Sequence, residues 1–204
     1  YFPHYHQGAR TMKDGDFLLM DYAPDYGYYM SDITRMWPVN GKFSKAQREL
    51  YGFYLACYQS ILYNIKPYMT AKEVGAKAIV EMEKHLAEAR FSKAIYQKAA
   101  ENFVKSYKRG NSRRTSLGHF VGMATHDVGK LEGPYLPGMV FTIEPALRVP
   151  EEMIYIRLED LIIIHEDKAE IVSEFLPMDI DSIEKIMKEK GMSQQYPREK
   201  GGKD

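Results

Sequence analysis

Residues 139–164 read MVFTIEPALRVPEEMIYIRLEDLIII and contain two runs typical of β-strands, 139–149 and 154–164. Both runs are rich in Val, Ile, Leu, Phe and Tyr, which favour strands, and the polar residues between them favour a turn. A shorter strand is predicted at 170–172. The second half of the chain is therefore expected to form a β-sheet.

The N-terminal part of the chain has the pattern of a β-hairpin. Strand-like runs at 17–23 and 28–39 flank Pro24, Asp25 and Gly27, residues that are common in turns. Two strands joined by so short a turn pair in the antiparallel direction.

Helices are predicted between the hairpin and the sheet. Capping boxes at 44–47 (Ser to Gln) and 70–73 (Thr to Glu) each precede apolar residues at helical spacing. The first helix is expected to end near Pro67, a third to span 91–107, and a last one to start near Asp179. Strands, helices and strands in that order predict an α+β domain rather than an alternating parallel sheet.

The composition indicates one soluble globular domain. Of the 204 residues, 45% are apolar and 27% are charged, and the 28 basic residues balance the 28 acidic ones. A formal charge of zero gives no sign of a nucleic-acid-binding surface, and no apolar run approaches the roughly 20 residues of a membrane-spanning helix. We expect the catalytic domain to span 1–187 and the polar residues 188–204 to form a disordered tail.

The chain has a single cysteine, Cys57, on the apolar face of the first predicted helix, where a core role is expected. One cysteine cannot form an internal disulfide, which fits a reducing compartment, so a cytoplasmic location is the default expectation.

Four acids lie in predicted strands: Asp21 and Asp32 in the hairpin, and Glu144 and Glu159 in the second half. A single acid in a strand is most simply a solvent-facing residue. Several carboxylates in one partly buried cleft repel one another, however, and stay ionised only if cations compensate them. Two divalent ions would match four ionised carboxylates.

A nitrogen ligand for such ions is available in the Gly-rich segment GHFVGMATHDVG, residues 118–129. His119 is the natural ligand, and His126 follows seven positions later, too far for the helical histidine pair of a zinc protease. We therefore expect the two histidines to have separate roles. An oxygen-rich shell with one imidazole suits Mn²⁺, Co²⁺, Fe²⁺ or Zn²⁺.

Five segments resemble the landmark segments of the pita-bread metallopeptidases, in particular the branch of Xaa-Pro aminopeptidase (aminopeptidase P) and prolidase. They agree in order, residue type and spacing, and the resemblance runs from His4 to about residue 187. The segments are DGDFLLMDY (14–22), YYMSDITRMWPV (28–39), GHFVGMATHDVG (118–129), LPGMVFTIEPAL (136–147) and IRLEDLIII (156–164).

The resemblance implies a pita-bread fold, an antiparallel sheet flanked by helices, and two metal ions, most simply Mn²⁺. It implies that Asp21 holds one metal, that Asp32 and Glu159 bridge both, and that His119 and Glu144 complete the shell of the other. These are the residues to which the charge argument also leads.

The resemblance also assigns residues that are not ligands. His126 matches a histidine that hydrogen-bonds the substrate, His4 matches one that lines the pocket, and Arg157 matches an arginine near the metals. In the implied mechanism a water between the two ions loses a proton to give a hydroxide nucleophile, and Glu144 accepts and passes on that proton. One metal and His126 stabilise the oxyanion.

The implied function is hydrolysis of the N-terminal Xaa-Pro bond of a peptide with proline in second position. A prolidase acting on Xaa-Pro dipeptides is a close alternative, with Arg157 or Arg148 as the cation for the free carboxylate. Methionine aminopeptidase and creatinase fit the motifs less well. An alternative of another class is a catalytically silent binding module or inactive fragment. Members of the family are often homodimers.

Two departures from the family pattern stand out. Thr115 occupies the position of a second histidine usual in aminopeptidase P, and threonine cannot carry a proton in the same way. The chain also lacks the helices, strand and separate domain that precede the match to His4. It is therefore expected to be N-terminally truncated, with exposed apolar surface on the first hairpin.

Overall fold

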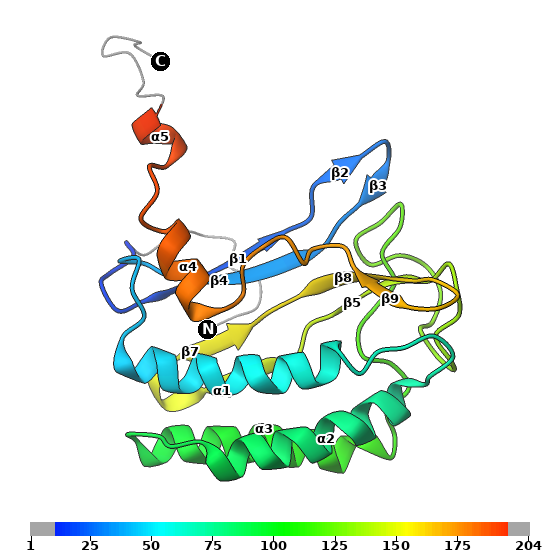
Figure 1. Ribbon diagram of the computed structural model, residues 1–204, viewed down its shortest axis with the longest axis horizontal. Helices are drawn as coiled ribbons and strands as arrows, with labels where there is room; N and C mark the ends of the chain where they lie inside the picture. The colour runs from blue at the N-terminus through cyan, green and yellow to red at the C-terminus, as the bar shows by residue number, and fades with distance from the viewer. Residues whose placement is uncertain (1–10, 196–204) are drawn as a thin grey trace.

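The computed structural model describes residues 11–195, so the predicted site residue His4 and residues 196–204 of the predicted tail lie outside the described part. Figure 1 shows the strands in one layer, with the three long helices gathered on one side of it. The order of hairpin, helices and sheet is that of an α+β domain, as predicted. The helices are α1 (Lys45–Leu62), α2 (Ala71–Glu88), α3 (Ala94–Asn111), α4 (Ile180–Ile186) and α5 (Met192–Gln195).

The strands form antiparallel pairs throughout. β1 pairs with β4, β2 with β3, β6 with β7, and β8 lies between β5 and β9. The strands are β1 (Phe17–Tyr22), β2 (Asp25–Tyr26), β3 (Tyr29–Met30), β4 (Ile33–Pro38), β5 (Val140–Ile143), β6 (Ala146–Val149), β7 (Ile154–Arg157), β8 (Asp160–Ile164) and β9 (Ala169–Ile171).

The predicted hairpin is present as the β1–β4 pair, extended at its tip by β2 and β3. The chain reverses at Gly27 and Tyr28, which have φ angles of 58° and 71°. Two successive residues in the left-handed region are typical of the tight turns that suit the twist of a hairpin. Of the three predicted turn residues, Gly27 lies in the turn, Asp25 belongs to β2, and Pro24 precedes it.

The two long strands predicted in the second half are each interrupted. Ile143 pairs with Asp160, and Ala146 pairs with Arg157, so one register continues across a gap of two residues in each strand. Pro145 lies in this gap and has no N–H to donate to the ladder. We call these four residues, 144–145 and 158–159, the strand break. Both acids predicted to lie in these strands lie in the break instead.

The helix starts are set by the predicted capping boxes. Ser44 and Thr70 are the N-caps of α1 and α2, and both capping boxes are complete. α1 ends at Leu62, five residues short of Pro67, and Tyr63 is its C-cap. α3 begins and ends about one turn later than predicted, and Asp179 caps α4 as expected.

α1 lies at the centre of the apolar core. Tyr54, Cys57 and Tyr58 on its buried face are 0% exposed. The predicted core role of Cys57 is confirmed, and burial raises the pKa of its thiol to about 12. A protonated, inaccessible thiol packs as a small apolar group.

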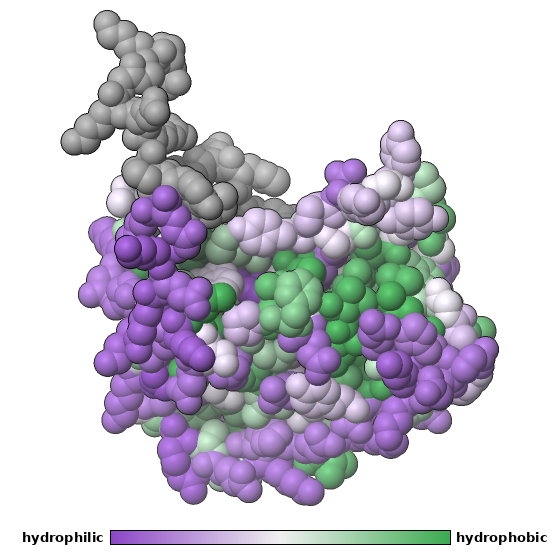
Figure 2. Space-filling view, turned by 45° about the horizontal axis from the view of Figure 1, so that its top comes forward, coloured by the Kyte–Doolittle hydropathy of each residue, from purple (hydrophilic) through white to green (hydrophobic). Residues whose placement is uncertain are grey.

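The first hairpin exposes aromatic residues, as expected: Tyr26 is 93% exposed, Tyr28 81% and Tyr29 64%. In Figure 2 hydrophobic residues also gather on the face below this hairpin. The segment after β9 adds Phe175, which is 78% exposed.

The described part of the predicted tail, 188–195, contains the four-residue helix α5. None of the helices between residues 11 and 195 is long and apolar enough to cross a membrane.

Candidate metal centre

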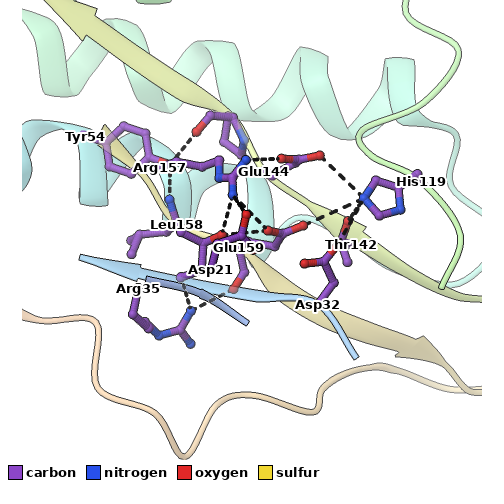
Figure 3. Close-up of polar contacts among 12 residues, drawn as sticks. Asp21, Asp32, Arg35, Tyr54, His119, Thr142, Glu144, Arg157, Leu158 and Glu159 are labelled. Atoms are coloured by element: carbon purple, nitrogen blue, oxygen red, sulfur yellow. Dashed lines mark hydrogen bonds and ion pairs between the residues drawn. The ribbon is translucent and has the colours of Figure 1, made fainter. Parts of the chain in front are cut away.

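The strand break carries the candidate site, and three other segments reach it (Figure 3). Glu144 and Glu159 lie in the break itself. Asp21 comes from the end of β1, Asp32 directly precedes β4, and His119 comes from the Gly-rich loop before β5. Segments far apart in sequence thus bring all five predicted ligands to one place.

Two groups of ligand atoms form there. The atoms of His119, Glu144 and Glu159 lie within 4.8 Å of one another, and so do those of Asp21, Asp32 and Glu159. Nε2 of His119 is 3.5 Å from Oε1 of Glu144 and 3.5 Å from Oδ2 of Asp32. Glu159 belongs to both groups, which is the arrangement required of a ligand shared by two ions.

His126 stands beside this cluster. Its ring lies 4.2 Å from the ring of His119, with an angle of 72° between the ring planes. Its ligand atom also falls within 4.8 Å of those of Asp32 and His119. Because His126 is exposed, it is accessible to a molecule entering the site.

The site opens into a cavity of about 400 Å³. Sequence reasoning missed Tyr155 as a lining residue, although it lies two positions before Arg157 and so shares its face of β7. Thr115 is exposed. The cavity is lined by Asp21, Ala23, Asp32, Thr125, His126, Glu144, Tyr155, Arg157 and Glu159.

Glycines let the loop approach the sheet closely. A Cβ on Gly118 would lie 1.8 Å from the carbonyl oxygen of Thr142, so only glycine fits directly before His119. A Cβ on Gly122 would lie 1.9 Å from Oδ2 of Asp127. That same oxygen accepts the N–H of Met123, which orders the loop next to His126.

Arg157 is the cation inside the carboxylate cluster. It is 3% exposed and donates to Asp21, to Oε2 of Glu144 at 3.0 Å and to Oγ1 of Thr34 at 3.0 Å. One guanidinium therefore fixes acids from β1 and from the strand break in a single arrangement.

The pKa values of several ionisable groups in the site are shifted in different directions. Burial and the charge of Asp21 raise the pKa of Asp32 to about 6, and burial and the charge of Asp32 raise that of Glu159 to about 8. Contact with Glu144 raises the pKa of His119 to about 9, and the same contact lowers that of Glu144. Such opposed shifts in one cleft are typical of a functional site.

Glu159 shows that the residues suit a metal ion. It is 1% exposed, and its Oε2 accepts a hydrogen bond from Thr34, but its Oε1 has no hydrogen-bond partner within the described part of the chain. A buried carboxylate oxygen without a donor is costly unless a cation compensates it. This oxygen lies 3.9 Å from Nε2 of His119, on the side where the other ligands meet.

The model of metallopeptidase family M24 matches residues 1–166. The chain belongs to metallopeptidase family M24. Membership of this M24 family implies divalent metal ions, which agrees with the donor set found here.

Similar M24 relatives are Xaa-Pro aminopeptidases. The Escherichia coli Xaa-Pro aminopeptidase is 33% identical over 201 residues, covering 90% of this chain and 44% of the relative. Xaa-Pro aminopeptidase 3 of Rattus norvegicus is 30% identical over 197 residues, covering 90% of this chain and 37% of the relative. The chain therefore spans less than half the length of these relatives.

Solved structures show the same fold. Zinc-substituted E. coli aminopeptidase P in complex with product is 32% identical with a TM-score of 0.71, covering 91% of this chain and 44% of that chain. The E. coli enzyme with the inhibitor Pro-Leu gives the same values. The fold is thus the pita-bread fold of the M24 aminopeptidases, as the sequence motifs predicted.

Proposed function

We propose that this protein is a di-metal exopeptidase that hydrolyses the N-terminal Xaa-Pro bond of peptides. The observation that carries the proposal is the position of Glu159, which belongs both to the group with His119 and Glu144 and to the group with Asp21 and Asp32. The M24 relatives that support the substrate class are Xaa-Pro aminopeptidases.

In this proposal the five side chains hold two divalent ions, with Asp32 and Glu159 shared between them. Bound there, such ions lower the pKa of a water molecule toward neutrality and polarise the peptide carbonyl. We propose manganese as the native ion, because a shell of carboxylate oxygens with one imidazole suits it.

Protein side chains carry out the remaining steps, which are proton transfer, hydrogen bonding to the substrate and positioning of the ligands. The lowered pKa of Glu144 keeps it ionised, so it accepts the proton of the attacking water and passes it to the leaving nitrogen. His126, exposed at the cavity, donates a hydrogen bond to the substrate oxygen that becomes negative. Arg157 holds Asp21 and Glu144 in place. His4 is proposed as a pocket residue on the sequence motif alone.

The test is hydrolysis by the full-length protein, supplied with Mn²⁺, of an Xaa-Pro dipeptide and an Xaa-Pro-Xaa tripeptide. Cleavage of the tripeptide is expected. Asp32→Asn removes a shared ligand and should abolish cleavage, whereas Asp25→Asn, which changes an exposed acid of the same hairpin, should not.

Other outcomes would redirect the proposal. Cleavage of the dipeptide alone would indicate a prolidase. A metal-supplied protein that binds no ion and cleaves neither peptide would instead be a silent binding module.

The remaining proposals concern organisation and location. We propose that the catalytic domain ends near residue 187, that the protein forms homodimers, and that it works in a reducing compartment such as the cytoplasm. The single, fully buried cysteine supports the last point. Limited proteolysis, sedimentation and cell fractionation test these three statements in turn.

A further inference from the structure

The hydroxyl group of Tyr54 joins the two sides of the strand break. It donates to the carbonyl oxygen of Pro145 at 2.5 Å and accepts the N–H of Leu158 at 2.8 Å. Tyr54 is on α1 and is 0% exposed, so no water competes for either bond. Figure 3 shows its ring reaching this point from the side of the helix.

The hydroxyl replaces a hydrogen bond of the sheet. The register of β5 with β8 and of β6 with β7 places Pro145 opposite Leu158. In an uninterrupted ladder the two residues would bond directly, at an N···O distance of about 2.9 Å. Here no direct bond between Leu158 and Pro145 is present, and the Tyr54 oxygen accepts the N–H and donates to the carbonyl oxygen in its place.

The residues next to this relay are the candidate ligands. Glu144 directly precedes Pro145, and Glu159 directly follows Leu158. The two backbone segments from which these carboxylates project are therefore both bonded to the Tyr54 hydroxyl. The ring is itself held in place, since it stacks on Tyr58 at 6.1 Å and packs edge-on to Phe103 at 6.0 Å.

We propose that Tyr54 is a positioning residue of the metal centre, whose hydroxyl keeps Glu144 and Glu159 at the separation that metal binding needs. The inference rests on the proposed function in one respect, namely that these carboxylates bind metal. Without the hydroxyl, Pro145 and Leu158 either close onto each other or remain buried and unpaired, so the backbone next to both ligands is no longer held in this arrangement.

The test compares Tyr54→Phe with Tyr51→Phe in the full-length protein. Tyr51 is a matched control because it lies on the same helix, is 0% exposed and donates its hydroxyl to a carbonyl, that of Met178, at 2.6 Å. Both variants keep the ring, but Tyr51→Phe loses one hydrogen bond and Tyr54→Phe loses the two that join the sides of the strand break. Co²⁺ affinity by calorimetry, the visible absorption of bound Co²⁺, and amide exchange at Leu158 are measured for each.

Tyr54→Phe should weaken Co²⁺ binding by about 10- to 100-fold, the usual effect of losing a group that orients metal ligands. It should also alter the Co²⁺ absorption and accelerate Leu158 exchange, whereas Tyr51→Phe should change none of the three. Equal Co²⁺ affinities and spectra in the two variants would overturn the inference.

The readouts separate this inference from the proposed function. If the wild-type protein binds no Co²⁺, the proposed function fails, and the exchange rate of Leu158 alone decides whether Tyr54 holds the break. If Tyr54→Phe does not fold, exchange in the wild type decides, because a Leu158 amide as unprotected as in an unfolded chain would contradict the hydrogen bond.

Discussion

Thr34 and Glu159 are joined by three hydrogen bonds. Their backbones exchange N–H···O bonds of 3.3 and 3.1 Å, and Oγ1 of Thr34 donates to Oε2 of Glu159 at 2.8 Å. The same hydroxyl accepts a bond from Arg157. One oxygen of Glu159 is therefore fixed from the hairpin, and the other is left to face the remaining ligands.

Removing the Thr34 hydroxyl should weaken the metal centre without unfolding the protein. Thr34→Val keeps the shape of the side chain but leaves Oε2 of Glu159 without its donor, so metal affinity should fall by about 10-fold or more. Thr34→Ser keeps the hydroxyl and should bind nearly as well as the wild type. Calorimetric titration with Mn²⁺ measures both, and equal losses in the two variants would argue against this role.

A second buried ion pair, between Arg35 and Asp160, links β4 to β8 next to the site. Arg35 and Asp160 are paired at 2.5 Å, and Asp160 also accepts the hydroxyl of Tyr58. Arg35→Met leaves a buried carboxylate without its cation and should cost about 3–5 kcal/mol of unfolding free energy.

Denaturant unfolding provides the measurement, and an exposed pair provides the control. Arg48 pairs with Glu184 near the surface, so Arg48→Met should cost at most about 1 kcal/mol. Similar losses from the two arginine variants would show that burial of the Arg35 pair has no energetic consequence.

The metal-free protein should lose stability as pH rises from 6 to 9. The raised folded-state pKa values, about 8 for Glu159 and about 9 for His119, mean that the folded state binds protons more tightly than the unfolded chain in this range. Stability therefore falls as these groups lose their protons. The lowered pKa of Glu144 acts only at more acidic pH.

Melting temperatures in a chelator, measured across this range, test the expectation. Glu159→Gln removes one of the two titrations and should flatten the decline between pH 6 and 8. Metal binds the deprotonated groups, so added Mn²⁺ should raise the melting temperature more at pH 8 than at pH 6. A melting temperature that rises with pH in the chelator would contradict the assigned shifts.

Gly118→Ala should disturb the position of His119. The added methyl group would meet the backbone of Thr142, which cannot move aside as a flexible side chain does. A destabilisation of about 1–3 kcal/mol is expected, together with weaker metal binding. Gly110→Ala, in the last turn of α3 with only the tip of Arg114 nearby, should be neutral or slightly stabilising by the same measurements.

Local signals made much of the fold predictable. The capping boxes at Ser44 and Thr70 mark helix starts because both partners of each box lie within four residues. The five candidate ligands were recognisable because acids are unusual in apolar runs and because the motifs agree with the family. The structure brings these residues together, which sequence spacing alone does not establish.

The strand break and the role of Tyr54 were not predictable in the same way. The apolar pattern continues through 139–149, so nothing local marks the interruption except Pro145. Tyr54 reads as one more aromatic residue on an apolar helix face, because its hydrogen-bond partners are 91 and 104 residues away in sequence. Contacts of that range depend on how the helix docks against the sheet.

The rate at which the buried thiol of Cys57 is alkylated reports how often the structure around it opens. Cys57 is the only cysteine in the chain and lies on the helix from which Tyr54 reaches the strand break. An alkylating reagent can reach it only when the packing around that helix opens, so the rate of labelling counts those openings directly. Labelling that slows when metal is added would reveal, without any engineered probe, that the centre and the helix layer open as one unit.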